Sequence, residues 1–280
     1  EAQKHRPATE EDADVVVRVG GERLGIEEVD SLGVRVQRDA LSEMQEQLLQ
    51  MEASELIKLY GFSPPVDSSV DQQGKVLESK NHANATRVTG RPEGDAPVAP
   101  WGFGDQFRME SVPDALRFVV EEILDSPKWA VGKPRHLTIN RRENSFFKLE
   151  PQLDPVGDGE CVFIVCLLSN SVITLCPPGE FDRRRPAEIS LESWTDQDVD
   201  VLMRRRSMLL LSGMSRNIWR HGIRKGVQVE TETDGNKDLA VCDWWGKKQN
   251  LVRRSPQMLS ITLAFEKVAE MPQDDSSLFD

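Results

Sequence analysis

The chain has 280 residues, of which 38% are hydrophobic and 29% are charged, and its formal net charge is −12. This length allows one domain with extensions, and no apolar run approaches the roughly 20 residues that a membrane-spanning helix needs. The acidic balance argues against a protein that binds nucleic acid through its overall charge. We therefore expect a globular chain without a membrane span.

The first hundred residues are predicted to contain one helix between two irregular segments. Residues 1–36 are rich in charge and poor in aromatic residues, which predicts an acidic, extended arm. Within 37–61, Leu and Met recur at helical spacing among Glu, Gln and Lys, which indicates an amphipathic helix that ends at Gly61. Its apolar stripe needs a partner, either the core domain or another protein. Residues 62–99 lack aliphatic periodicity and are predicted to be a linker.

Residues 100–270 form the predicted folded domain, of the α+β class and mainly β. A helix over 112–123 is followed by short apolar strands separated by turns, a pattern typical of a sandwich or jelly roll. Two polar insertions, 177–201 and 226–256, are expected at the mouth or edge of the barrel, and 271–280 form an acidic tail. The predicted strands span 136–140, 162–168, 172–176, 207–211, 227–231 and 258–265.

The cysteines predict an intracellular, reducing compartment. The chain has four, none of them in a Cys-x-x-Cys pair, and a free cysteine in a core strand behaves as a small hydrophobic residue. Because the sequence begins at Glu1 rather than Met, a transit peptide removed on entry into an organelle remains an open alternative.

Two segments far apart in the sequence carry candidate metal ligands. The apolar run 207–211 leads into SGMSRNIWRHGI at 212–223, which places His221 at a strand end beside Gly222, where a metal could approach. Upstream, the chain reads Gln152-Leu153-Asp154. Residues two apart on a strand point to the same side, so both could face one ion. These segments resemble the distal histidine and the His-x-Asp pair of the AlkB family, iron(II) and 2-oxoglutarate-dependent dioxygenases that remove alkyl groups from nucleic acids.

The resemblance, which covers about 101–268, implies a double-stranded β-helix (jelly roll) core with N-terminal helices. Such a centre holds iron by two imidazoles and one carboxylate. Asp154 and His221 match two of the three ligands, whereas Gln152, a weakly coordinating amide, stands at the third. His136 is expected to lie too far upstream to replace it. Two alternatives stay open, because Asp154 could cap a turn before Pro155 and His221 could hydrogen-bond within the core.

The positions that bind the co-substrate are altered as well. The family's Asn-x-Tyr motif, whose tyrosine contacts 2-oxoglutarate, corresponds here to Asn140-Arg141-Arg142. The two arginines of its last strand, one of which pairs with the distal carboxylate, correspond to Met258 and Ala264. A buried dianion needs a cation. The candidate contacts for 2-oxoglutarate are Asn140, Arg142 and Arg254, with Arg253 beside it.

These departures predict a catalytically inactive AlkB-like protein without cofactors. It would serve as a structural or binding subunit of a larger assembly and bind protein partners through the amphipathic helix and the insertions. The alternative is an active dioxygenase that binds Fe(II) and 2-oxoglutarate and demethylates alkylated RNA, DNA or protein. A third possibility is RNA binding at a local basic patch formed by arginines of 183–185, 204–206 and 216–225.

Overall fold

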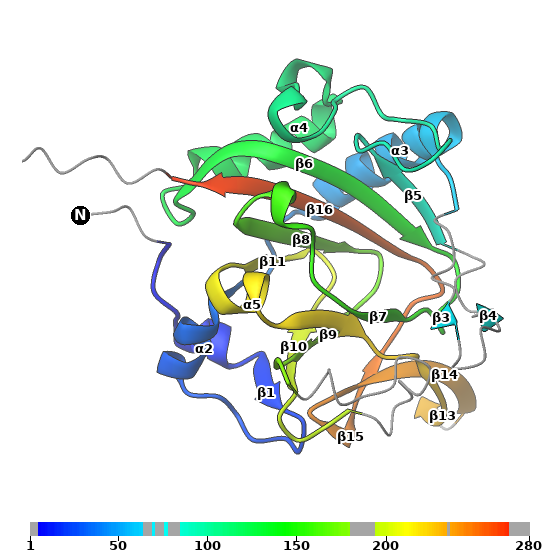
Figure 1. The fold of residues 1–280 in the computed structure, drawn as a ribbon. Coiled ribbons are helices and arrows are strands. Elements are labelled where there is room, and N and C mark those ends of the chain that lie inside the picture. The colour runs from blue at the N-terminus through cyan, green and yellow to red at the C-terminus, as the bar shows by residue number, and fades with distance from the viewer. Residues whose placement is uncertain are drawn as a thin grey trace, which may run out of the picture.

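Two antiparallel sheets packed face to face define the architecture of the computed structural model (Figure 1). The structure describes residues 5–63, 69–70, 76–77, 85–179, 194–233 and 236–268. The six-stranded sheet has the order β2-β11-β8-β16-β6-β5, formed by Val34–Gln37, Ser207–Leu211, Cys161–Leu167, Met258–Lys267, Val131–Arg142 and Ala85–Thr89. The five-stranded sheet has the order β1-β10-β9-β12-β7, formed by Val16–Arg18, Val199–Met203, Ser171–Cys176, Arg220–Ile223 and Leu149–Gln152.

Eight of these strands, β6 to β12 and β16, form the barrel. Counted along the chain, the first, third, sixth and eighth lie in the six-stranded sheet, and the second, fourth, fifth and seventh lie in the other. This alternation between two sheets is the strand order of a jelly roll. The prediction of a mainly β jelly-roll core is therefore confirmed.

The six-stranded sheet is covered on both faces, which explains why its central strand β8 is apolar throughout. In β8, all seven residues are buried. Phe163 and Val165 belong to the hydrophobic cluster under the helices, whereas Val162 and Ile164 belong to the cluster between the sheets. Successive side chains of a strand point to opposite faces, so two different cores select hydrophobic residues at every position.

Two helices, α3 (Glu43–Tyr60) and α4 (Asp114–Asp125), cover the outer face of the six-stranded sheet (Figure 1). Helix α3 lies within the segment 37–61 expected to be helical and begins later, at a capping box. Ser42 Oγ accepts from Gln45 N at 3.2 Å, and Gln45 Oε1 accepts from Ser42 N at 2.7 Å. The Ser-x-x-Gln spacing was visible in the sequence and marks this start better than the apolar periodicity does.

The expectation of an extended arm over 1–36 is wrong. The segment contains α1 (Glu10–Ala13) and α2 (Ile26–Leu32), and its strands β1 and β2 extend one sheet each. Two short valine runs provide the buried strand residues, with Val16 and Val34 fully buried. Its charged residues are satisfied locally, as in the pair between Arg6 and the buried Asp12 at 2.5 Å. A high charge content therefore does not indicate an unfolded segment here.

The expectation of a linker over 62–99 is also wrong in part. Strand β5 pairs with β6 along its whole length and forms the edge of the six-stranded sheet. Short strands β3 (Ser69–Val70) and β4 (Val76–Leu77) pair with each other. The sequence signal was weak because β5, ATRVT, is short and half polar, as edge strands often are.

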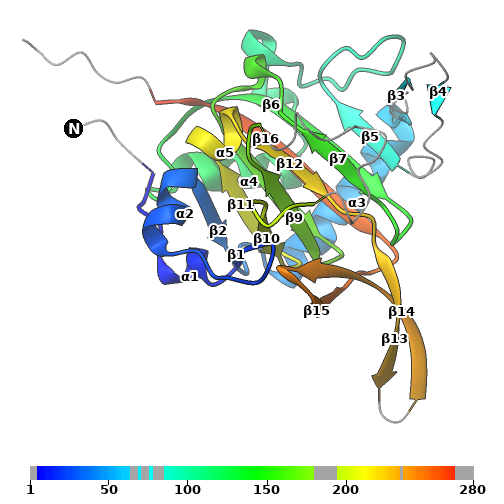
Figure 2. The same cartoon turned by 60° about the horizontal axis from the view of Figure 1, so that its bottom comes forward.

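The second insertion forms a sheet of its own. Strands β13 (Val227–Thr233), β14 (Asn236–Trp245) and β15 (Lys247–Arg253) pair in that order and project from the barrel (Figure 2). Most of the first insertion, residues 180–193, and the whole tail 271–280 lie outside the described residues. Among the described residues, no helix is both long and apolar enough to cross a membrane.

Candidate functional site

The two candidate metal-ligand segments meet at one end of the five-stranded sheet. Strand β12 pairs with β7, and His221 and Gln152 are register partners across this pair. Asp154 lies two residues beyond Gln152, and its Oδ1 is 3.8 Å from Nε2 of His221. His221 is buried and Asp154 is half-buried. The fold therefore brings together the three residues that the sequence singled out.

Gly222 has a structural role different from the one expected. A Cβ at this position would lie 2.9 Å from the carbonyl oxygen of Leu149 and 3.1 Å from the nitrogen of Pro151, both in β7. Only a glycine permits this close approach of the two backbones. The missing side chain of Gly222 therefore makes room for the strand that carries Gln152, not for a metal.

Arg216 holds the loop that carries Asp154. It lies in helix α5 (Gly213–Asn217) and is 3% exposed. Its guanidinium donates to the carbonyl oxygens of Asp154 at 3.0 Å and of Pro155 at 2.7 Å. Because these contacts are made to the backbone, the Asp154 carboxylate remains free to face His221. Arg216 thus positions Asp154 next to His221, which lies in the same 212–223 segment as Arg216.

The site opens into a cavity of about 280 Å³ between the two sheets. Its opposite wall carries a group of cations, Arg87, Arg91 and Arg142. Arg87 pairs with Glu93 at 3.3 Å, and Arg91 pairs with Asp158. Neither Arg87 nor Arg91 was predicted as a site residue, because both lie in the segment 62–99 that was interpreted as a linker.

Arg142 is the cavity cation without an acidic partner among the described residues. Its Cα is the register partner of Met258. Burial lowers the pKa of its guanidinium to about 10, with smaller contributions from the charges of Arg87 and Arg254. The group therefore stays cationic at neutral pH. Asn140, the other predicted contact on this strand, accepts from Arg87 Nε at 3.1 Å.

The strand order and the position of the site are both those of one known architecture. The core is a double-stranded β-helix. This is the fold that the sequence resemblance to the AlkB family implied, and that expectation is confirmed by the eight barrel strands and by the meeting of β7 and β12 at the cavity.

Comparisons with known proteins agree with this fold but are distant. No family model matches the sequence, and no curated protein matches it. A solved structure of OsALKBH1 has 14% identity and a TM-score of 0.44, and the match covers 83% of this chain and 97% of that one. HygX from Streptomyces hygroscopicus, with nickel and 2-oxoglutarate bound, has 13% identity and a TM-score of 0.43, with 91% and 92% covered. At these scores, the fold assignment rests on the strand order of the chain itself.

His136, expected to lie too far upstream to replace the third ligand, also lines the cavity of the double-stranded β-helix. Its Nε2 contacts Thr138 Oγ1 at 2.6 Å. Burial lowers the pKa of the imidazole to about 3, helped by the charges of Arg91 and Arg87. His136 is therefore neutral at physiological pH and packs with Thr138 on the cationic wall.

The residues at this site do not make up a complete iron centre. Within the described part of the chain, no group of three or more His, Cys, Asp or Glu side chains could hold a metal ion. Asp154 and His221 supply two strong donors, and Gln152 supplies an amide. Burial raises the pKa of the Cys161 and Cys166 thiols to about 12, so neither presents a thiolate.

Arg254 does not serve the cavity, which corrects its assignment as a co-substrate contact. Its guanidinium pairs with Asp243 at 2.8 Å and donates to the carbonyl oxygens of Ser145, Phe147 and Arg224. All of its donors are thus used within the protein. It joins the projecting sheet to the barrel and carries no free hydrogen bond for a ligand.

Four arginines of the predicted basic patch contact groups of the protein itself. Arg216 and Arg224 are each 3% exposed. Arg205 pairs with the buried Glu46 at 2.6 Å, and Arg206 pairs with Glu43 at 2.9 Å. These cations stabilise the protein itself, and residues 183–185 lie outside the described part of the chain.

Proposed function

We propose that this AlkB-like double-stranded β-helix protein has lost its iron centre and serves as a binding or structural subunit. The observation that carries the proposal is the register of β7 and β12. It sets Gln152 directly across from His221. The resemblance to the AlkB family assigns Gln152 to the position of the third ligand. The proposal thus rests on a substitution at a site whose other two positions, Asp154 and His221, are kept in contact.

The chemistry of the donors explains why one substitution matters. An imidazole nitrogen binds divalent iron strongly, whereas a neutral amide oxygen is a weak donor for it. Changes in groups that only support metal ligands already reduce affinity about 10–100-fold, so replacing a ligand itself should cost more. Oxygen activation at such a centre requires bound iron as well as 2-oxoglutarate. A site that does not retain the metal would therefore be inactive.

An anaerobic titration with Fe(II) and 2-oxoglutarate tests the proposal directly. We expect no saturable visible charge-transfer band from the wild-type protein at metal concentrations that fill an intact centre. A saturable band that disappears in His221→Ala would show an assembled iron site and would overturn the proposal.

A second candidate function, an active dioxygenase, is favoured by Arg142. The resemblance places a 2-oxoglutarate-binding arginine at Met258, and Arg142 is the register partner of that residue on the neighbouring strand. A cation is therefore present one strand away from the expected position, and no carboxylate among the described residues neutralises it. This arrangement suits the distal carboxylate of a small dicarboxylate.

The second candidate predicts that 2-oxoglutarate binds without metal through Arg142. With EDTA present, 2-oxoglutarate at roughly ten times Kd should stabilise the wild-type protein by about 1.4 kcal/mol. The melting temperature should rise accordingly. Arg142→Met should abolish this shift. Arg141→Met is the matched control, because Arg141 is adjacent, points to the other face of β6 and pairs with Glu143 at 3.2 Å. Equal shifts in all three proteins, or none, would exclude Arg142 as the binding group.

A further inference from the structure

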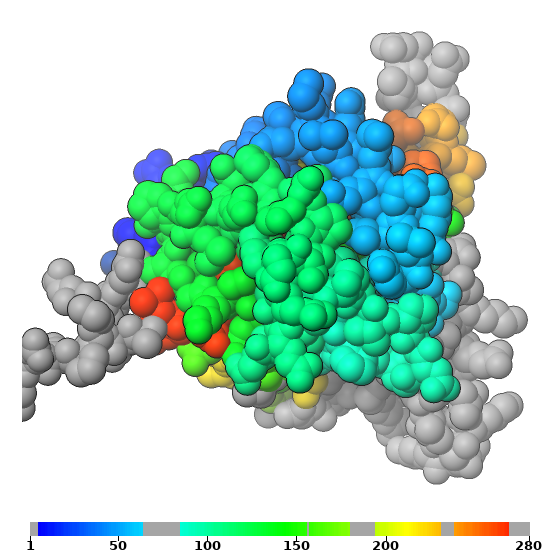
Figure 3. All heavy atoms as spheres, turned by 90° about the horizontal axis from the view of Figure 1, so that it is seen from above, coloured from blue at the N-terminus to red at the C-terminus, as the bar shows by residue number. Residues whose placement is uncertain are grey.

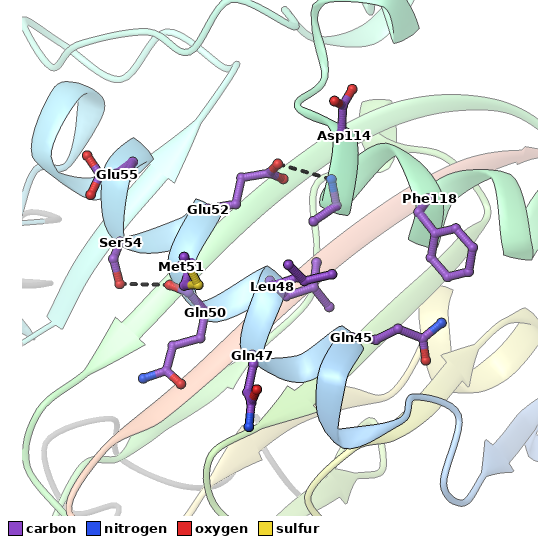
Figure 4. Close-up of a pocket in the computed structure, with 12 residues that line it drawn as sticks. Gln45, Gln47, Leu48, Gln50, Met51, Glu52, Ser54, Glu55, Asp114 and Phe118 are labelled. Carbon is purple, nitrogen blue, oxygen red and sulfur yellow. Dashed lines mark hydrogen bonds between the residues drawn. The ribbon is translucent and has the colours of Figure 1, made fainter.

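A large apolar groove lies on the opposite side of the six-stranded sheet from the cavity. Helices α3 and α4 lie beside each other on this face (Figure 3). Between them is a groove of about 1110 Å³ lined by Leu48, Met51 and Phe118 (Figure 4). Leu48 is 51% exposed and Met51 is 67% exposed. Large apolar side chains gathered in one hollow are typical of an interaction site.

The residue spacing along α3 shows that Leu48 and Met51 belong to a second apolar face of this helix. Leu49, Ala53 and Leu56 are buried against the sheet. Met44, Leu48 and Met51 follow at intervals of four and three on the open side, where residues share one helix face. Leu59, 68% exposed, lies two turns further along. The sheet and α4 therefore bury one apolar stripe of α3, and the other stripe has no partner within the described residues.

Glu52 fixes the two walls of the groove relative to each other. Its carboxylate accepts from the backbone nitrogen of Ala115 at 3.0 Å (Figure 4) and from that of Leu116 at 2.8 Å, both in the first turn of α4. An acidic group at a helix N-terminus satisfies free N–H groups and interacts favourably with the helix dipole. The groove is thus held open by a specific contact and is formed before any partner arrives.

The charges around the groove select its occupant. Helices α3 and α4 carry eight carboxylates, of which Glu46 and Glu43 pair with Arg205 and Arg206 outside the two helices. The other six stand against two cations of the helices, Lys58 and Arg117, which leaves an excess of four negative charges. A symmetric dimer through this face would bring like charges together, which disfavours a second copy of the chain. The rim carboxylates Glu55 and Asp114 are exposed, and among the described residues they pair only with Lys58 and Arg117 of their own helices. Such exposed pairs are weak. A basic partner can therefore compete for them.

We propose that the groove binds an amphipathic helix of a partner protein, apolar on one face and flanked by Lys or Arg. Helix α3, with 18 residues, is about 27 Å long, which gives room for a helix of several turns alongside it. Leu48, Met51 and Phe118 contact its apolar face, and Glu55 and Asp114 contact its basic flanks. This inference rests on the proposed role as a binding subunit and names the chemistry of the partner.

The test uses the full chain and two labelled peptides of about 18 residues that share one leucine face. One carries lysine on its flanks and the other carries glutamate, and binding is followed by fluorescence anisotropy at about 0.15 M salt to screen non-specific attraction. We expect the lysine peptide to bind at least about tenfold more tightly than the glutamate peptide. Leu48→Gln and Phe118→Gln should each weaken it about tenfold, as loss of a central apolar anchor does. Leu239→Gln, on the projecting sheet and 64% exposed, is the matched control.

The charge-reversed double variant Glu55→Lys with Asp114→Lys should exchange the preference between the two peptides. Equal affinity for both peptides, or unchanged lysine-peptide binding in Leu48→Gln and Phe118→Gln, would overturn the inference. A concentration-dependent dimer that Leu48→Gln dissolves would also overturn it, in favour of a second copy. The iron titration is independent of these results, because Leu48 and Phe118 do not line the cavity. The inference and the loss of the iron centre can therefore fail separately.

Discussion

Gln152→His is expected to raise the affinity of the protein for divalent metal by about 100-fold, because it adds the missing imidazole to two ligands already in place. Residues directly opposite each other in an antiparallel pair have Cβ atoms about 4.5–5.5 Å apart. Gln152 and His221 are such register partners, and both line the cavity. The new imidazole would therefore lie beside His221, whose Nε2 is 3.8 Å from Oδ1 of Asp154.

Calorimetric titration with Co(II) or Ni(II), as stable stand-ins for Fe(II), measures this gain. Two controls separate ligation from a general effect of the substitution. Gln152→Asn keeps an amide and should leave the affinity unchanged. The double variant Gln152→His with His221→Ala should lose the gain, because only one imidazole remains. If Gln152→His binds metal no better than the wild type, Gln152 is not at the third ligand position, and the proposed loss of the iron centre has no support.

Arg254→Met is expected to lower the free energy of unfolding by about 3–5 kcal/mol, because it leaves a buried carboxylate without its cation. The side chains of Arg254 and Asp243 are 0% and 2% exposed, and their closest atoms are 2.8 Å apart. Asp243 also accepts from the backbone nitrogen of Val172, in β9 of the barrel. The pair therefore joins the projecting sheet to the core, and its loss affects both.

The neighbouring residue provides the control for this prediction. Arg253 pairs with Asp238 at 3.0 Å, but both side chains are about 60% exposed. Such a surface pair contributes about 0–1 kcal/mol, so Arg253→Met should cost little. Urea unfolding followed by circular dichroism compares the two variants. A loss under about 1 kcal/mol in Arg254→Met would show that the buried pair is not needed for stability.

The pH dependence of Arg254→Met follows from the same burial. Burial raises the pKa of Asp243 above its ordinary value even with Arg254 beside it. Removal of the cation should raise this pKa further. Between the ordinary and the raised pKa the folded state binds the proton more than the unfolded state does, so stability increases as the pH falls through this window. The deficit of Arg254→Met should therefore shrink on acidification from neutral pH.

Much of the barrel could be predicted from the sequence because its signals are local. The runs at 162–168, 172–176, 207–211 and 258–265 match β8, β9, β11 and β16 within one or two residues at most ends. In β8, β11 and β16, the apolar residues are buried by two cores, one on each face of the six-stranded sheet, so consecutive positions are hydrophobic. The apolar residues of β9 are buried in the core between the two sheets. The candidate site was predictable for a similar reason, since Gln152, Asp154 and His221 stand in short recognisable segments.

The edges of the fold were less predictable because their strands are short and stand among charged residues. Strands β1, β2 and β5 have three to five residues each and are held by pairing with distant strands. An edge strand buries little apolar surface of its own, so it leaves a weak pattern among charged neighbours. For this reason the segments 1–36 and 62–99 were interpreted as irregular.

By itself, the sequence determined several of the jelly-roll strands, the amphipathic helix, and the histidine, aspartate and glutamine of the candidate metal site. The tertiary structure decided which charges serve the cavity and which serve the fold. Arg87 and Arg142 face the cavity, whereas Arg254 and Arg216 bind groups of the protein itself. The physical reason is the range of the interactions. A strand or helix is selected by the spacing of its own residues, whereas the partner of a buried charge is set by segments that meet only after folding.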